Sequence, residues 1–118
     1  MEAAYAELEK GVKAAGFFTT FMPNEEPGDR IVCASRQYTS GPRKGGLGGN
    51  SFWVAKEGND WFVGTWAPVE FRVLDVERLL ELCILLLGRE PAGAYSRIDE
   101  KVQREFGLVE IVDEDFPE

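Results

Sequence analysis

The side chains that most often carry out catalysis or bind metals are scarce in this sequence. It contains no histidine and only two cysteines, Cys33 and Cys83, which lie far apart in the chain. Without histidine no Ser-His or Cys-His nucleophilic pair can form, and two separated thiols do not make a structural zinc site. The acidic runs 25–26 and 113–115 fall in expected loops, which do not hold carboxylates in a fixed geometry. The sequence therefore favours a protein without catalytic activity and predicts no metal and no cofactor.

The glycine-rich stretch 39–50 is a second place where chemistry could occur. It contains five glycines and the adjacent cations Arg43 and Lys44. Glycines let backbone N–H groups approach an anion, and the two cations would attract it. However, the phosphate-binding spacing GxxxxGK[ST] is absent, and a strand rather than a helix is predicted to follow. We expect a mobile loop whose cations act in association rather than in folding, with anion binding as the alternative.

Three tryptophans, Trp53, Trp61 and Trp66, are candidate partner contacts because tryptophan is enriched at interaction hot spots. They lie in runs 52–56 and 61–66, which are rich in aromatic and β-branched residues and typical of a β-hairpin. A three-residue loop of Gly58, Asn59 and Asp60 would place Phe52, Val54, Phe62 and Trp66 on one face and Trp53, Ala55, Trp61 and Val63 on the other. A two-residue loop changes these groups but still leaves a tryptophan on each face. The sheet is therefore expected to be apolar on both faces.

Polar side chains on the predicted strands form an alternative candidate site. In 69–73, Val69, Phe71 and Val73 alternate with Glu70 and Arg72, which predicts one dry and one wet face near a sheet edge. Glu70 and Arg72 could join Thr65, Arg36 or Tyr38 around a small ligand on the wet face. Cross-strand ion pairing explains the same residues without a ligand.

The remaining elements define the fold. Helices are predicted at 2–15, at 76–87 after Asp75, and from a capping-box-like start at Ser96 to Gly107. Strands are predicted at 17–22, 31–38 and 108–112, and an acidic tail at 113–118. Because consecutive strands follow without intervening helices, we expect a single α+β domain. It has an N-terminal helix, an antiparallel sheet of four to five strands, and two C-terminal helices packed on the sheet.

The helix at 76–87 is almost wholly apolar, which predicts that it lies across the sheet and is covered on most sides. The alternative is that part of it lines a dimer interface. Cys83 on this helix and Cys33 on a strand are expected to be free, buried thiols that act as small hydrophobes.

Composition limits the class of partner. A chain of 118 residues with a net charge of −8 is long enough for one core and too acidic to favour nucleic acid. No signal peptide or membrane span is evident, which predicts a cytoplasmic protein.

These observations favour a non-catalytic protein-interaction domain that binds a basic protein partner. In size and charge alone the chain resembles bacterial secretion chaperones and toxin-immunity proteins, so a chaperone-like or immunity-like role is expected. The alternative is a small-molecule or anion-binding domain, or an enzyme, with a pocket between the sheet and the glycine-rich loop. A homodimer is a further prediction, because thin terminal helices would leave apolar surface uncovered.

Overall fold

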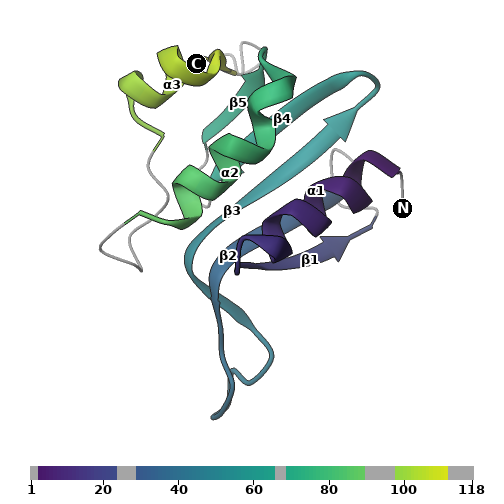
Figure 1. Cartoon of the computed structure of the whole chain (residues 1–118), viewed down its shortest axis with the longest axis vertical. Coiled ribbons are helices and arrows are strands. Elements are labelled where there is room, and N and C mark those ends of the chain that lie inside the picture. The colour runs from purple at the N-terminus through teal and green to yellow at the C-terminus, as the bar shows by residue number, and fades with distance from the viewer. Residues whose placement is uncertain (1–2, 24–28, 66–68, 90–97, 112–118) are drawn as a thin grey trace, which may run out of the picture.

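The predicted α+β architecture is confirmed by a computed structural model, which describes residues 3–23, 29–65, 69–89 and 98–111 (Figure 1). The elements, in chain order, are α1 (Ala3–Ala14), β1 (Phe18–Met22), β2 (Arg30–Gln37), β3 (Leu47–Glu57), β4 (Asp60–Thr65), β5 (Val69–Val73), the 3-10 turn η1 (Val76–Arg78), α2 (Leu79–Leu87), α3 (Glu100–Phe106) and β6 (Leu108–Glu110). Within the described residues the six strands form one antiparallel sheet in chain order. The predicted sheet of four to five strands was therefore too small.

The β3–β4 hairpin turns through two residues. Glu57 pairs with Asp60, so Gly58 and Asn59 form the loop, and the φ of 61° at Gly58 suits the turn types that two-residue hairpins need. The face groups expected from a three-residue loop were therefore wrong. One face carries Phe52, Val54, Trp61 and Val63, and the other carries Trp53, Ala55 and Phe62. The expectation of a tryptophan on each face is confirmed.

Helices α1 and α2 cover the same face of the sheet (Figure 1). The spacing of Tyr5, Leu8, Val12 and Ala15 by three and four predicts one buried face of this helix. The first three are buried against the strands, whereas Ala15 lies beyond the end of α1 and is exposed. From α2, five side chains join this core, namely Leu79, Leu82, Cys83, Leu86 and Leu87. The Tyr5 hydroxyl donates a hydrogen bond to the Asp29 carbonyl (2.9 Å), so it also ties α1 to the start of β2.

The opposite face has a smaller apolar cluster. Val32, Trp53 and Ala55 are buried there, and Met22, Leu47 and Phe62 pack against them. The Trp53 indole lies against Gly64 of the neighbouring strand, and the Arg30 guanidinium lies over its ring at 4.6 Å. The expectation of two apolar faces is confirmed.

Two helix starts differ from the sequence-based expectation. Residues 76–78 form a 3-10 turn ahead of α2, and the Asp75 side chain makes no capping hydrogen bond. The N-cap of α3 is Asp99, whose extended backbone lets its carboxylate accept a hydrogen bond from Val102 N at 3.0 Å. The expected start at Ser96 lies outside the described residues. The helix ends at Gly107 as predicted, with a left-handed φ of 64°.

The glycine-rich stretch is part of a projecting hairpin, which we call the arm (residues 36–47). The expectation of one loop over 39–50 was wrong for its last four residues, because β3 begins at Leu47. The Tyr38 amide donates to the Gly46 carbonyl (2.9 Å), and the Gly45 amide donates to the Tyr38 carbonyl (2.8 Å). The Tyr38 ring packs where a side chain at Gly48 would lie. Glycine here makes room for that ring.

Both cysteines are free and buried, as predicted. Cys33 on β2 and Cys83 on α2 belong to the main core, where the helix rests on the sheet. A hydrogen bond with Cys33, together with burial, raises the pKa of the Cys83 thiol well above its ordinary value. The folded protein therefore keeps this proton at alkaline pH.

Stability is expected to fall once the pH exceeds about 8.5, the ordinary pKa of a cysteine thiol. Above that pH the unfolded chain loses the Cys83 proton and the folded chain retains it, so the free energy of unfolding decreases. For one such group the limiting slope is about 1.4 kcal/mol per pH unit. Urea unfolding of the wild type and Cys83→Ala at neutral and alkaline pH measures it. Equal slopes for the two proteins would contradict the prediction.

Candidate interaction groove

The outer side of α2 carries an apolar stripe formed by Val76, Leu80 and Ile84. These residues are spaced by four, which places them on one side of the η1–α2 segment. Val76 is 40% exposed and Ile84 37%, and Leu80 is half-buried. Five of the nine residues of α2 are buried, so the expectation that this helix is covered on most sides is confirmed, but one side of it remains exposed. The sheet covers its inner side, and its outer side is open to solvent.

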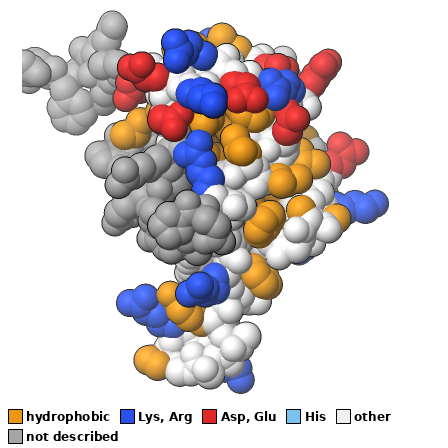
Figure 2. Space-filling view, turned by 60° about the vertical axis from the view of Figure 1, so that its left-hand side comes forward, with side chains coloured by type: hydrophobic (Ala, Val, Ile, Leu, Met, Phe, Trp, Pro, Cys, Tyr) orange, Lys and Arg blue, Asp and Glu red, His pale blue; other side chains and the backbone are white. Residues whose placement is uncertain are grey.

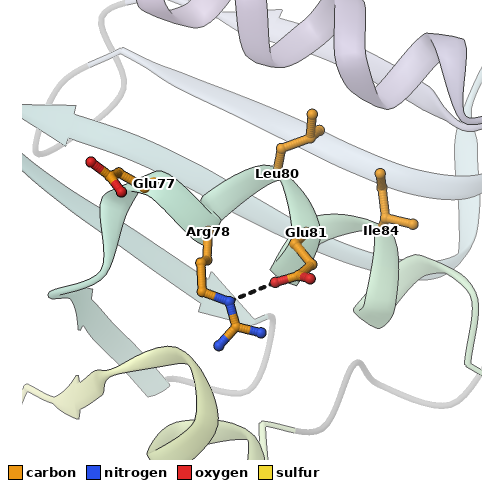
Figure 3. A pocket seen from close by; sticks show the side chains of 5 residues that line it. All are labelled: Glu77, Arg78, Leu80, Glu81 and Ile84. Atoms are coloured by element: carbon orange, nitrogen blue, oxygen red, sulfur yellow. Dashed lines mark hydrogen bonds and ion pairs between the residues drawn. The ribbon is translucent and has the colours of Figure 1, made fainter.

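Two hollows adjoin this stripe. The first, of about 580 Å³, is lined by Glu77, Arg78, Leu80, Glu81 and Ile84 (Figure 3). The second, of about 330 Å³, is lined by Ala4, Glu7, Leu8, Trp61, Val76, Glu77, Leu79 and Leu80. Both hollows are lined by Glu77 and Leu80, and we call the two together the groove.

Gly11 lets helices α1 and α2 approach each other closely beside the groove. A Cβ atom at this position would lie 2.6 Å from Leu80 Cδ2. Glycine costs a helix about 1 kcal/mol relative to alanine. Gly11 lets the backbone of α1 pack directly against the Leu80 side chain. Leu80 therefore contacts α1 and also forms the floor of the groove.

The groove is apolar at its floor and acidic at its rim. Glu81 is paired with Arg78, whose Nε lies 2.6 Å from Glu81 Oε2 (Figure 3). This hydrogen bond is the main reason that the pKa of Arg78 lies above its ordinary value. Among the described residues, Glu7 and Glu77 have no ion-pair partner. These two carboxylates are available to a cation from another molecule.

Arg78 is directed away from the stripe. Its guanidinium lies over the Phe106 ring at 4.4 Å and donates to the Glu105 carbonyl at 2.8 Å. In Figure 3, Leu80 and Ile84 point to the opposite side of the helix from Arg78. The one cation in the lining therefore links α2 to α3 and does not neutralise Glu7 or Glu77.

The candidate tryptophans occupy different places. Trp61 is 7% exposed and packs edge-on against Tyr5, with ring centroids 5.5 Å apart, beneath the second hollow. Trp53 is 5% exposed, on the opposite sheet face. Trp66 lies outside the described residues. Neither described tryptophan forms the flat exposed patch that would mark a partner surface.

The candidate polar residues do not converge. Arg36, Tyr38, Arg43 and Lys44 are on the arm, whereas Glu70 and Arg72 are on β5. Three strand spacings, about 14 Å, separate β2 from β5. Arg72 instead pairs with Asp60 across the strands at 2.8 Å, the arrangement expected without a ligand. The two hollows described above lie on the helix side, away from the arm.

The groove itself was missed by sequence reasoning. The available signal was the spacing of Val76, Leu80 and Ile84 beside Glu77 and Glu81, which indicates an apolar stripe with an acidic border. This signal was not recognised because the helix is apolar on nearly every side, and such a composition predicts burial on every side.

Other site types find no support in the described part of the chain. It has no group of three or more His, Cys, Asp or Glu side chains placed to hold a metal ion. No helix in the described ranges combines the length and the hydropathy needed to cross a bilayer. Comparison of the chain with protein-family models, curated proteins and solved structures finds no match.

Proposed function

We propose that this domain is a non-catalytic protein-interaction module that binds a basic segment of a protein partner in the groove. The observation that carries the proposal is the combination of an open apolar stripe with two carboxylates, Glu7 and Glu77, that lack an ion-pair partner among the described residues. Neutralising or chaperoning that partner is the role we propose for the complex.

The floor of the groove supplies apolar contact. Val76, Leu80 and Ile84 follow one another along a helix, so a partner segment can lie along α2 and cover them together. Well-packed apolar contacts at the centre of an interface, surrounded by a polar border, contribute most of the binding free energy. This surface has that arrangement.

The rim supplies selectivity for charge. A net charge of −8 attracts cationic partners over the whole surface, and Glu7 and Glu77 place acceptors beside the stripe. Complementary charge mainly raises the association rate and rejects acidic competitors. A partner with apolar side chains flanked by lysine or arginine therefore fits best.

Affinity capture from the native cell extract, with wild type, Ile84→Glu and Leu85→Glu as baits, tests the proposal. Ile84 and Leu85 are similarly exposed neighbours on α2, at 37% and 40%, but only Ile84 lines the groove. A carboxylate at Ile84 would face the apolar part of a partner and should reduce recovery about tenfold or more. The Leu85→Glu bait is the matched control and should recover as much as the wild type.

Mass spectrometry of the captured proteins gives the result. We expect a basic protein that is recovered by wild type and Leu85→Glu and lost from Ile84→Glu. Equal recovery by all three baits would place the interface elsewhere. Recovery of no specific protein, with tight binding of a metabolite, would favour the small-molecule alternative.

A further inference from the structure

The arm is a second surface that the proposed function leaves unused. Its twelve residues, 36–47, include the cations Arg36, Arg43 and Lys44 and no acidic residue. All three cations are exposed. Figure 2 shows basic but no acidic side chains at the arm end of the molecule, whereas acidic and basic side chains lie together at the other end. The arm is therefore a basic segment on a protein with a net charge of −8.

Backbone hydrogen bonds close the arm as a hairpin, although its glycine content predicts a mobile loop. The Lys44 amide donates to the Gly41 carbonyl (3.1 Å), and the Gly46 amide donates to the Arg43 carbonyl (2.8 Å). These bonds close the tip, and the Arg43 guanidinium lies 5.9 Å from the centre of the Tyr38 ring. A preformed hairpin has less conformational entropy to lose on docking than an open loop.

The arm lies far from the second hollow of its own chain, which is the hollow that contains Glu7 and Glu77. The second hollow includes Trp61, which pairs with Lys56 on β3. Lys56 lies nine residues along β3 from Leu47 at the arm, a distance of about 30 Å. The arm continues β2 and β3 away from the body (Figure 1), so its tip points into solvent.

We infer that the arm of one copy docks in the groove of a second copy of this chain. The inference rests on the proposed function, because it uses the same groove as an acceptor for a basic segment. Arg43 and Lys44 supply two cations for the two carboxylates Glu7 and Glu77. Pro42, next to them at the tip, is exposed and supplies an apolar contact for Leu80 and Ile84.

Self-association of this kind competes with the protein partner. When the arm of a second copy occupies the groove, the protein partner must displace that arm in order to bind. In the absence of the partner, the groove is therefore filled by another copy of the chain. If the two copies exchange arms reciprocally, the contact closes as a dimer; if they do not, it continues as a chain.

Sedimentation velocity at low and high ionic strength tests the inference with two charge reversals. One variant carries Arg43→Glu and Lys44→Glu, and the other carries Glu7→Lys and Glu77→Lys. The wild type is expected to associate at low ionic strength and to dissociate as salt screens the contact. Each variant alone should associate about tenfold more weakly or not at all, because arm and groove then carry like charges. An equimolar mixture should associate again, because each variant supplies the complement of the other.

A matched control carries Lys101→Glu and Arg104→Glu on α3, which change the net charge as the arm variant does, at exposed positions away from the arm. It should associate like the wild type. Circular dichroism checks that all variants are folded, and the surface positions make folding defects small.

A monomeric wild type at every concentration, unchanged association of both variants, or a mixture that stays monomeric would overturn the inference. The capture experiment separates the two proposals. A monomeric protein that still recovers a basic partner through Ile84 keeps the proposed function and loses only the self-association.

Discussion

Replacement of Gly64 by alanine is expected to lower the free energy of unfolding by about 3 kcal/mol or more. A Cβ atom at this position would lie 2.0 Å from Trp53 Cζ2 and 2.1 Å from Cε2, so it would overlap the indole ring. The ring must therefore leave its place against β4. Trp53 then loses its buried position, and its contacts with Val32 and Ala55 are weakened. Urea unfolding followed by tryptophan fluorescence measures the loss.

A double-mutant cycle identifies the clash as the cause. Trp53→Leu removes the ring atoms that a Cβ at Gly64 would meet, so alanine at position 64 should cost little in that background. The two substitutions together should cost about as much as Trp53→Leu alone, with a coupling energy of about 3 kcal/mol, equal to the cost of Gly64→Ala in the wild type. Additive losses would show that Gly64 acts through backbone conformation rather than through the indole.

Local residue patterns were sufficient for most of the elements. Tyr5, Leu8 and Val12 predicted the buried face of α1, and Gly107 predicted the end of α3. The hairpin around Gly58 was predicted from local turn chemistry. These features depend on neighbours in the sequence, which is why a single sequence contains them.

Features set by contacts between distant residues were not predicted. The length of the β3–β4 loop depends on which register buries Trp61 beneath α1, and local turn residues allowed both lengths. Residues 47–50 looked like a loop because glycines disfavour strands, yet the pairing of Leu47 with Gln37 extends the sheet through them. Tertiary pairing outweighed local propensity in both places.

The candidate site illustrates the same limit. The tryptophans were chosen as candidate partner contacts because of their residue type. Residue type does not distinguish an interaction hot spot from a core residue, and Trp53 and Trp61 are both buried. The groove depends on which side of α2 the sheet leaves open. The exposed side of α2 is set by the packing of α1 against it at Gly11, which cannot be derived from the sequence of α2 alone.

The glycine-rich neighbours of Asn50 predicted a loop. Asn50 instead lies on β3, and its side chain caps the C-terminal end of α2. It is 2% exposed, and its Nδ2 donates to the carbonyl oxygens of Leu87 (3.2 Å) and Arg89 (2.7 Å). The last carbonyls of a helix have no partner within the helix, so the amide satisfies acceptors at the C-terminal end of α2. Its own backbone N–H donates to Ser35 Oγ at 2.8 Å. One side chain thus joins β3 to α2 at the base of the arm.

Asn50→Asp is expected to lower the free energy of unfolding at neutral pH by about 3 kcal/mol or more. The change keeps the shape of the side chain but turns two donated hydrogen bonds into repulsion between a carboxylate and two carbonyl oxygens. The negative end of the α2 dipole adds to this repulsion. A buried carboxyl in such a place has a raised pKa, so the folded variant binds a proton more readily than the unfolded chain. The loss should therefore shrink as the pH falls toward about 4, where the carboxyl of the unfolded chain also becomes protonated.

Asn59→Asp is the matched control, because it makes the same chemical change at an exposed position in the β3–β4 turn. It should change the free energy of unfolding by less than about 0.5 kcal/mol. Urea unfolding of both variants at neutral and acidic pH separates the two positions. If Asn50→Asp were as mild as Asn59→Asp, the amide would not hold α2 against β3, and the helix would have to be positioned by its leucines alone.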